Sequence, residues 1–409
     1  MRSLAGRACG MLACASAFVA GVGCSMGEES RPWIPPGPMA SARADASDLT
    51  ELLKIREMRL DEGPAPSDVG ALRVERVAVG NDQRCVISSD HAVRCWTWDP
   101  WHSLTGSLEP ARAKRPVADL SGVTQVALGY DHGCALLATG HVRCWGSNVT
   151  GQVGDGTRAA RSHVSPVLGL HDVTAIAAGL RHTCARTRKG LVKCWGNNES
   201  GELGLGEPEK FKAFDFRSLP VPVKGLSHVA GIALGAKFSC AWLENGTAHC
   251  WGRGREGELG AGTRVPVGDA RPTPGRVEGL EHVELLRAGG HEACAILKNG
   301  EVWCWGANLK GSLGDGTKES HPSPVRVEGW DGVEDLQLGD ERACGRFPGG
   351  EVRCAGFWPN EKDLRLTPTP VPLLSNVTQL ELFNGLVALN EDGTIMTWTH
   401  RGGIMRIKW

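Results

Sequence analysis

Pairs of cysteines ten residues apart recur at a period of about fifty residues through most of the chain. Around each pair runs the same order of features: an apolar stretch ending in Gly, four residues, Cys, a hairpin, Cys, and usually Trp-Gly. A fixed period of this length is typical of repeat proteins, in which each repeat is one small structural unit that stacks on its neighbours. The pairs are Cys85 and Cys95, Cys134 and Cys144, Cys184 and Cys194, Cys240 and Cys250, Cys294 and Cys304, and Cys344 and Cys354.

The glycine spacing predicts that each pair is a cross-strand disulfide. A glycine lies six residues after the first cysteine of five pairs, at Gly140, Gly190, Gly246, Gly300 and Gly350. A three-residue hairpin loop favours glycine at its third position, where φ is positive. The two cysteines then face each other at a Cα separation of about 4.5–5.5 Å, which a disulfide accepts. His91 replaces the glycine in the first copy, which leaves open a different loop shape there.

A seventh copy lacks both cysteines. Val387 and Thr397 take their places, and this joint loss favours bonds within a repeat rather than between repeats. Five repeats also have an upstream Leu-x-x-Val turn, four have a downstream glycine turn, and a proline-flanked apolar strand follows that turn. Several short strands per repeat, separated by Gly and Pro turns, predict an all-β fold. We expect a seven-bladed β-propeller in which each blade is a small antiparallel sheet.

The repeated motif resembles the regulator of chromosome condensation repeat family. Gly-x-x-His-x-Cys-Ala, Gly-x-Val-x-Cys-Trp-Gly and Gly-x-Leu-Gly-x-Gly-Thr follow one another most closely at 179–206 and 289–317. The resemblance covers residues 73–409 and implies a propeller. It is much less specific for function, because that family includes a nuclear exchange factor for a small GTPase, light-receptor-like and ubiquitin-ligase-linked propellers, and a secreted bacterial inhibitor of β-lactamases.

The amino terminus has the pattern of an export signal. Arg2 and Arg7 precede a short apolar run, which predicts a secretory signal peptide over 1–23. The run ends Gly21-Val22-Gly23-Cys24, which resembles a bacterial lipobox with an atypical first residue. Of the fifteen cysteines, the six pairs leave Cys9, Cys14 and Cys24. Signal removal discards the first two, and acylation of Cys24 removes an otherwise odd thiol. Conventional cleavage near residues 15–20 is the alternative.

Residues 24–72 have the composition of a tether. Pro32, Pro35, Pro36 and Pro38 precede a stretch rich in Ala and Ser, as in linkers that hold a domain away from a surface. Residues 48–60 are a possible short helix, and a partly ordered linker is the simpler interpretation. The propeller would occupy 73–409. We therefore expect an exported, lipid-anchored protein at the bacterial cell envelope, on the outer membrane or cell surface, with secretion as the alternative.

Charge and motifs argue against several function classes. The formal net charge is −1, from 45 basic and 46 acidic residues without long runs of one sign, whereas nucleic-acid binding rests on clustered Lys and Arg.

Histidines such as His132, His182, His228 and His282 recur at repeat-equivalent positions, which favours packing or turn roles over metal ligation. The cysteine spacing suits disulfides rather than zinc, and the Asp-Gly-Thr turns offer too few carboxylates for calcium. No catalytic motif is present. We expect a protein that is not an enzyme and needs no metal or cofactor.

Aromatic residues that break the repeat pattern are the candidate partner-binding residues. Loops on a rigid scaffold carry binding function, and aromatic side chains are common interface anchors. The alternative is that these rings fold back and cover the blades. The candidates are Trp98 and Trp101 in the first blade, Phe211, Phe214 and Phe216 in an insertion between the third and fourth hairpins, and Phe357 and Trp358 in the sixth blade.

These features favour a monomeric scaffold that binds a protein partner and meets the membrane only through its lipid anchor. Two other classes remain as alternatives: an envelope enzyme acting at the mouth of the propeller, and a guanine-nucleotide exchange factor by family analogy. Fold alone does not choose between them. We also expect that the tail 404–409, or a strand near 71–79, closes the ring, because exposed sheet edges are a liability.

Overall fold

The computed structural model describes residues 72–81, 83–97, 117, 119–206, 215–266, 270–358, 363–383, 385–398 and 404–407. The chain divides into two compact units, 1–49 and 50–409, and every described residue belongs to the second. Cys24 and the tether lie outside the described residues. Among the residues that are described, no helix is long and apolar enough to cross a bilayer.

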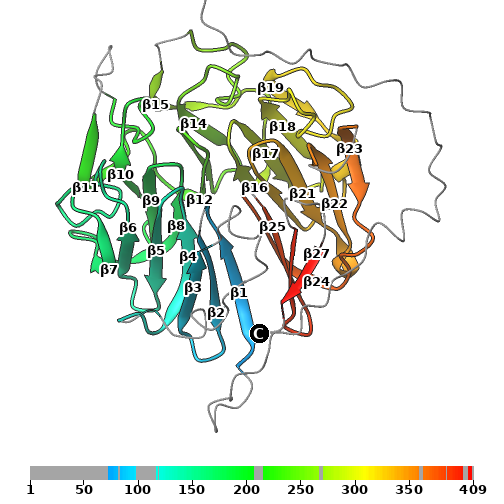
Figure 1. Cartoon of the computed structure of the whole chain (residues 1–409). Helices are drawn as coiled ribbons and strands as arrows, with labels where there is room; N and C mark the ends of the chain where they lie inside the picture. Colours follow the sequence, from blue (N-terminus) through cyan, green and yellow to red (C-terminus); the bar gives the residue numbers. More distant parts are fainter. Residues whose placement is uncertain are drawn as a thin grey trace, which may run out of the picture. The chain divides into compact units, whose positions relative to one another are not determined.

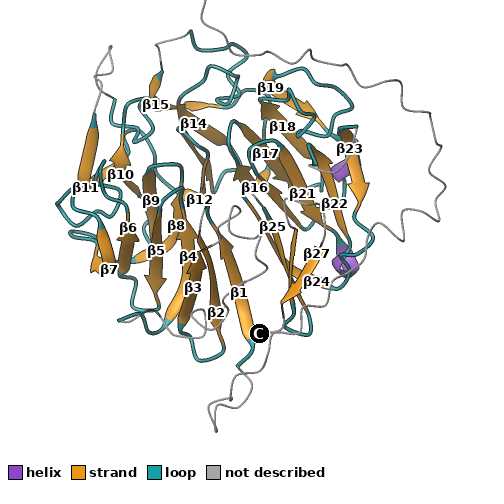
Figure 2. Ribbon diagram, in the orientation of Figure 1, coloured by secondary structure: helices purple, strands orange, loops and turns teal. Residues whose placement is uncertain are grey.

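Seven antiparallel sheets follow one another along the chain and form the seven blades of a β-propeller (Figures 1 and 2). The first strands of the blades are β1 (Val74–Val79), β4 (Val123–Leu128), β8 (Val173–Ala178), β12 (Val229–Leu234), β16 (Val283–Ala288), β20 (Asp335–Leu338) and β24 (Val377–Leu382). The second strands are β2 (Gln83–Ser88), β5 (His132–Leu137), β9 (His182–Thr187), β13 (Phe238–Leu243), β17 (Glu292–Leu297), β21 (Arg342–Arg346) and β25 (Leu386–Asn390). Each first strand contacts the first strand of the next blade, so the first strands line the centre of the ring.

The outer half of each blade is a hairpin strand followed by an edge strand. The third strands are β3 (Val93–Thr97), β6 (Val142–Gly146), β10 (Val192–Asn197), β14 (Ala248–Gly252), β18 (Val302–Gly306), β22 (Val352–Gly356) and β26 (Ile395–Trp398). The fourth strands are β7 (Arg161–Pro166), β11 (Phe216–Pro222), β15 (Arg271–Arg276), β19 (His321–Arg326), β23 (Arg365–Pro370) and β27 (Ile404–Ile407). Within the described residues, blade 1 has three strands. Only two short 3₁₀ turns, η2 (Glu328–Trp330) and η3 (Pro348–Gly350), interrupt the strands there. The all-β, seven-bladed prediction is confirmed.

Strand direction gives the propeller two distinct faces. Because neighbouring strands are antiparallel, the links from first to second strand and from third to fourth strand open on one face, which we call the loop face. The hairpins between second and third strands, and the turns into the next blade, open on the opposite face, which we call the hairpin face.

Six disulfides join second and third strands within their own blades, as the spacing predicts. The two cysteines of each pair are register partners, with Cα separations of 4.0–4.1 Å. From blade 1 to blade 6 the bonds join Cys85 to Cys95, Cys134 to Cys144, Cys184 to Cys194, Cys240 to Cys250, Cys294 to Cys304, and Cys344 to Cys354. Blade 7 places Val387 opposite Thr397 in the same register. All six predicted pairings are therefore confirmed.

The hairpin loop of blade 1 has the same shape as the others despite its histidine. His91 adopts φ 56° and donates its backbone N–H to Ser88 O at 2.7 Å. Gly140 donates in the same way to Leu137 O at 2.8 Å. The replacement of glycine by His91 thus leaves the loop conformation unchanged.

The glycine that follows the first strand of blades 1–6 is required by contact with the next blade. A Cβ added at Gly129 would lie 2.6 Å from Gly179 O, and one at Gly179 would lie 2.6 Å from Gly235 O. The same contact joins Gly80 to Gly129, Gly235 to Gly289, Gly289 to Gly339 and Gly339 to Phe383, at 2.5–2.8 Å. Backbone therefore packs on backbone at these six contacts, and a Cβ does not fit at the six glycines; blade 7 has Phe383 at the equivalent position.

The Leu-x-x-Val turns explain several histidines. The residue before the valine has a positive φ in each turn, at Gly122, Asp172, His228, His282 and Asn376, with φ between 54° and 64°. Polar side chains such as Asn and Asp tolerate this conformation better than apolar ones. His228 and His282 thus serve turn geometry, as their repeat-equivalent positions predict.

The edge strands are protected from pairing with other chains. Prolines interrupt the hydrogen-bonding edge of β11, β15, β19 and β23, and the glycine turn of each preceding blade donates an N–H to it. Gly156 N donates to Ser218 O at 2.9 Å, and Gly316 N donates to Leu366 O at 2.8 Å. Both devices reduce edge-to-edge aggregation.

The ring closes by packing of β1 against β24 and β25, which lie side by side in Figure 1. Gln379 of blade 7 bonds both backbone groups of Val77: Val77 N donates to Oε1, and Nε2 donates to Val77 O, each at 2.9 Å. Gln125 makes the same bidentate contact with Ile176 between blades 2 and 3. Of the two segments considered for closure, the N-terminal strand lies at the joint. The tail strand β27 instead pairs with β26 on the outer side of blade 7.

Candidate functional site

Two of the off-pattern aromatics lie within the described residues on the loop face and pair with cations. The Arg158 guanidinium of blade 2 lies 4.6 Å from the centre of the Phe216 ring in blade 3. Lys310 Nζ of blade 5 lies 5.6 Å from the centre of the Phe357 ring in blade 6. Both rings are partly exposed. Trp98, Trp101, Phe211 and Phe214 lie outside the described residues.

Trp358 has a packing role instead. Its side chain is 1% exposed and belongs to the core cluster between blades 6 and 7. The guanidinium groups of Arg342 and Arg365 lie 5.4 Å and 5.2 Å from the centre of its ring. A buried ring cannot be an anchor on the surface, so for Trp358 the alternative of covering the blade is correct.

Exposed aliphatic side chains add to the loop face. Leu309 is 70% exposed and Val149 is 50% exposed, at equivalent places in the third-to-fourth-strand links of blades 5 and 2. Tyr130, 40% exposed, lies on a first-to-second-strand link. The repeat pattern concealed these residues, because an apolar residue inside a conforming motif does not show in sequence whether it is buried.

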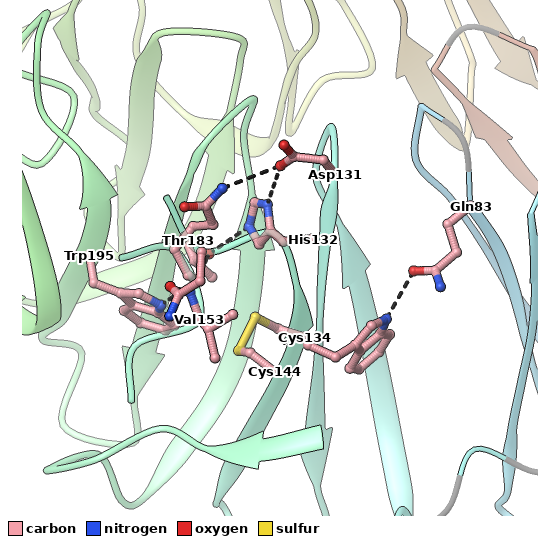
Figure 3. Close-up of a disulfide and its surroundings, with 11 residues drawn as sticks. Gln83, Asp131, His132, Cys134, Cys144, Val153, Thr183 and Trp195 are labelled. Atoms are coloured by element: carbon pink, nitrogen blue, oxygen red, sulfur yellow. Dashed lines mark hydrogen bonds and ion pairs between the residues drawn. A yellow bond between two sulfur atoms is a disulfide. The ribbon is translucent and has the colours of Figure 1, made fainter. Parts of the chain in front are cut away.

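Beneath the loop face of blades 2–4, buried histidines bond to hydroxyl groups of the next blade (Figure 3). His132 Nε2 lies 2.9 Å from Thr183 Oγ1, and Thr183 Oγ1 donates to Gln152 O at 3.3 Å. The Thr183 hydroxyl of blade 3 thus lies between the His132 ring and the Gln152 carbonyl of blade 2. Trp195 Nε1 donates to the same carbonyl at 2.8 Å. Burial lowers the pKa of His132 to about 4, against a small opposing effect of Asp131.

The next blade pair repeats this arrangement. His182 Nε2 lies 2.9 Å from Ser239 Oγ, which donates to Glu202 O at 2.8 Å. Burial, and then the neighbouring His132, lower the pKa of His182 to about 3. These histidines are neutral links between blades, which agrees with the packing role expected from their positions.

Blades 5 and 6 break the arrangement. Glu292 stands where His132 and His182 stand in their blades, and the hydroxyl position of the next blade is Ala343. Glu292 is 1% exposed; Ser312 Oγ donates to its Oε2 at 2.6 Å, and its Oε1 has no hydrogen-bond partner. Burial raises the pKa of Glu292 well above its usual value, and nearby Asp340 and Glu341 raise it further.

Further ionisable groups surround Glu292. His291 Nδ1 lies 3.5 Å from Glu258 Oε1, and both are buried atoms without a hydrogen bond. Asp340 packs directly on Gly290, where any added side chain would collide with its carboxylate. Phe357 N donates to Glu341 O at 2.9 Å, which joins the acidic residues to the exposed aromatic ring.

The first strands of blades 5–7 also carry polar side chains near the centre of the ring. Arg287 Nη2 donates to Asp335 Oδ1 at 2.8 Å, and Gln337 Nε2 donates to Asp335 Oδ2 at 3.2 Å. Gln379 Nε2 donates to Glu381 Oε1 at 2.9 Å. Burial raises the pKa of Glu381 to about 7. In blades 2–4 the positions equivalent to Arg287, Gln337 and Glu381 are alanines.

The arrangement suits recognition by charge and apolar contact. Among the described residues, no group of three or more His, Cys, Asp or Glu side chains could hold a metal ion. The sequence did not indicate Glu292, since its importance depends on which residue the next blade places opposite it. The signal that could have found it is the change from His to Glu at a repeat-equivalent position.

Comparison with known proteins agrees with the fold. The RCC1-like domain matches residues 56–345, more than half of the chain. Yeast RCC1 (Prp20), solved bound to Kap60, has 22% identity, a TM-score of 0.59 and 72% coverage of each chain. Human WBSCR16 has 19% identity, a TM-score of 0.61, and coverage of 78% of this chain and 91% of that chain. At these identities the likeness concerns the fold alone.

The curated relatives are similar over shorter stretches. The human E3 ubiquitin-protein ligase HERC2 is 32% identical over 116 residues, which are 27% of this chain and 2% of that protein. The Arabidopsis thaliana mitochondrial RCC1 domain-containing protein RUG3 is 28% identical over 182 residues, 42% of this chain and 31% of that protein. The chain thus spans less than a third of the length of these relatives. By the extent of the domain match, the protein belongs to the RCC1-like domain family.

Proposed function

We propose that this protein is a protein-binding propeller that presents its loop face to a partner and is exported and anchored to the bacterial cell envelope through acylated Cys24. The observation that carries the binding proposal is the 70% exposure of Leu309 on a disulfide-stiffened scaffold, where the next residue, Lys310, pairs with the Phe357 ring. The off-pattern aromatics of blades 1 and 3 belong to third-to-fourth-strand links, which would open on this same face. Trp98, Trp101, Phe211 and Phe214 remain predicted members of the surface.

The position of Arg73, near the first described residue, supports display of the loop face. Ser89 N donates to Arg73 O at 2.8 Å, and Arg73 Nη2 donates to Glu391 O at 3.0 Å, which places Arg73 on the hairpin face. A tether that joins the propeller there would leave the loop face unobstructed. The near-neutral charge of the chain disfavours nucleic acid as the partner.

Family members support a protein as the partner class. Yeast Prp20 has been solved bound to Kap60, and a second Prp20 structure is described together with its binding to Gsp1p and histones. Relatives that are ligases show that family membership alone does not decide between a binding protein and an enzyme. An enzyme acting at the propeller mouth is our second candidate, favoured by the raised pKa of Glu292, a property of general acids.

The test of binding compares two exposed leucines on opposite faces. The mature protein, immobilised through its N-terminus, is used to isolate a partner from envelope extract, and the purified partner is then titrated against variants. Leu309→Asp on the loop face should weaken binding by about tenfold or more, because it places a charge in an apolar contact. Leu191→Asp, at a 48% exposed site on the hairpin face, should leave affinity unchanged. Equal affinities of both variants and the parent would contradict the loop-face assignment.

Anchoring and enzymatic activity are tested separately. Mass spectrometry should find an acylated Cys24 at the mature N-terminus, and Cys24→Ala should abolish partition into detergent. Continued partition of Cys24→Ala would exclude the lipid anchor. Turnover of envelope polysaccharide or peptide that is lost in Glu292→Gln would favour the enzyme over the scaffold.

A further inference from the structure

We propose that the hairpin face of blade 3 binds the anionic headgroup surface of a phospholipid bilayer, and that this contact turns the loop face away from the membrane. The inference rests on the proposed anchoring at Cys24 and adds the orientation in which the propeller would be held. The contact is made by residues 186–193, which we call the blade 3 hairpin and which join β9 to β10.

The blade 3 hairpin concentrates basic side chains that the other hairpins lack. It contains four basic residues and no acidic one: Arg186, Arg188, Lys189 and Lys193. The equivalent eight residues of each other blade hold at most two Lys or Arg, and those of blades 4 and 7 hold acidic residues but no Lys or Arg. Because all seven hairpins have the same fold, the blade design does not require this charge.

None of these four side chains forms an ion pair with a described acidic residue. Arg186 donates to Val229 O and Thr174 Oγ1, and Lys193 Nζ donates to Gly169 O at 3.1 Å, all neutral acceptors. The side chains of Arg188 and Lys189 are exposed. The acidic residue joined to the hairpin is Asp172, and its Oδ2 lies 3.3 Å from His171 Nδ1. The positive charge of the blade 3 hairpin is therefore left uncompensated.

Exposed leucines lie on the same surface as the cations. Arg188 N donates to Asp172 O at 2.8 Å, and Lys193 reaches Gly169, so the hairpin rests on the turn that enters blade 3. Leu191 in the hairpin is 48% exposed, and Leu168 in the turn is 49% exposed. Basic residues beside exposed apolar ones suit a bilayer surface, where cations meet lipid phosphates and leucines enter the headgroup boundary.

The rest of the hairpin face decides how the propeller would meet the bilayer. The turns into blades 5 and 6 carry exposed acidic residues, which are Glu278, Glu281, Glu328 and Asp331. Exposed charges act over about 10 Å at 0.1 M salt, so an anionic surface attracts blade 3 without attracting blades 5 and 6. We therefore expect a tilted contact through blade 3 rather than a flat one through the whole face.

The point where the chain enters the propeller favours a membrane over other anionic surfaces. Arg73 lies on the hairpin face, and residues 25–72 join it to Cys24 in sequence. A lipid at Cys24 would keep this face close to a bilayer, where a few basic residues suffice for binding. Nucleic acid is the less suitable partner, because the chain has a formal net charge of −1.

The experiment measures vesicle binding without the lipid anchor. The full mature chain carrying Cys24→Ala is sedimented with vesicles of phosphatidylcholine alone, or of phosphatidylcholine and phosphatidylglycerol in equal parts. The test variant adds Arg188→Ser and Lys189→Ser. Its matched control adds Arg255→Ser and Lys318→Ser, which remove the same charge from exposed positions in the loop-face links of blades 4 and 5. All four substituted side chains are exposed, so both variants should fold normally.

We expect the protein to bind the vesicles that contain phosphatidylglycerol, and to bind phosphatidylcholine at least tenfold more weakly. The Arg188 and Lys189 variant should lose about tenfold or more in partition coefficient, and the matched control less than about twofold. Raising the salt concentration should weaken binding. No binding to either vesicle, equal binding to both, or equal losses in the two variants would overturn the inference. So would equally strong binding of a DNA duplex, which would indicate a general anion surface.

Failure of this inference is distinguishable from failure of the proposed function. Leu191→Asp should weaken vesicle binding while it leaves affinity for the protein partner unchanged. Acylation of Cys24 is read from the mass of the mature N-terminus, which the vesicle measurement does not involve. Loss of vesicle binding in Leu191→Asp would support the leucine contact, and unchanged vesicle binding would contradict it.

Discussion

Blades 2–4 and blades 5–7 share one backbone design but differ in what fills the space between blades. In blades 2–4, neutral His132 and His182 bond to hydroxyl groups of the following blade, and the first strands carry alanine near the centre of the ring. In blades 5–7, Glu292 takes the histidine position, Ala343 takes the hydroxyl position of the next blade, and charged residues such as Arg287 and Glu381 replace the alanines. Buried atoms without a hydrogen bond occur in both halves, at His132 Nδ1 and His182 Nδ1 in the first and at Glu292 Oε1 in the second, so the halves differ in charge rather than in unpaired atoms. A repeat protein can thus keep its fold in every blade and reserve its chemistry for a few.

The largest loss of stability should come from substituting the glycines that follow the first strands and pack on the next blade. This loss should be similar in the two halves of the propeller. Gly179→Ala in blade 3 and Gly289→Ala in blade 5 should each destabilise the protein by about 3 kcal/mol or more, because the new Cβ would lie 2.6 Å from an atom of the next blade. Gly279→Ala is the control: its φ is 77° but nothing lies near it, so the cost should be about 1 kcal/mol. Denaturant unfolding measures all three. If only one of the two substitutions destabilised the protein strongly, the close backbone contact between blades would not extend through both halves.

A disulfide can be replaced with the pair that blade 7 uses. The double variant Cys184→Val and Cys194→Thr copies Val387 and Thr397 into blade 3 and should cost about 2.5 kcal/mol through loss of the cross-link in the unfolded chain. Peptide mapping of the parent without reductant should find all six bonds within blades. A bond between blades, or aggregation of the double variant through new thiol pairing, would contradict the scheme.

The two halves should respond to pH in opposite directions. His132 and His182 have pKa values lowered to about 4 and about 3, so their contribution to stability is present above pH 6.5 and is lost as pH falls through 4 to 3. Glu292 and Glu381 have raised pKa values, the latter to about 7, so their contribution is present below pH 4.5 and is lost as pH rises toward 7 and above.

Unfolding free energy should therefore be nearly level between about pH 4.5 and 6.5, where the opposing slopes cancel, and should fall on both sides. The variant with His132→Gln and His182→Gln should lose the acid limb, and the variant with Glu292→Gln and Glu381→Gln should lose the alkaline limb. A pH profile that neither pair of substitutions changes would contradict the assignment of these groups.

Smaller changes in stability should follow substitutions at the residue before the first cysteine, which is Ser239 in blade 4 and Ala343 in blade 6. Ser239→Ala leaves His182 without its partner and should cost about 1–2 kcal/mol. Ala343→Ser places a hydroxyl at the equivalent position of blade 6 and should cost less than about 0.5 kcal/mol or stabilise the protein by a similar amount. Thermal unfolding of the two single variants checks the contrast; destabilisation by both to the same extent would remove the proposed difference between the halves.

The sequence predicted the blades well because each is specified locally. Cysteine spacing and the hairpin glycines define strand pairing within fifty residues, so the register of Cys184 opposite Cys194 followed directly. Contacts between blades were harder to predict, since they depend on residues about fifty positions apart. The Glu292–Ala343 mismatch, the Gln379–Val77 closure and the burial of Trp358 all arise there. Leu309 was overlooked because its exposure depends on how the turn packs, not on its motif.

The most direct test of the account compares two aromatic residues with the same local setting. Phe216 lies under Arg158 beside the regular half, and Phe357 lies under Lys310 beside the irregular half. Affinity for the purified partner should fall by roughly tenfold or more in Phe357→Ala and by less than about threefold in Phe216→Ala, with both variants folded. Equal losses, or a larger loss in Phe216→Ala, would contradict the proposal that the main contact on the loop face lies at Leu309 and Phe357, in blades 5 and 6.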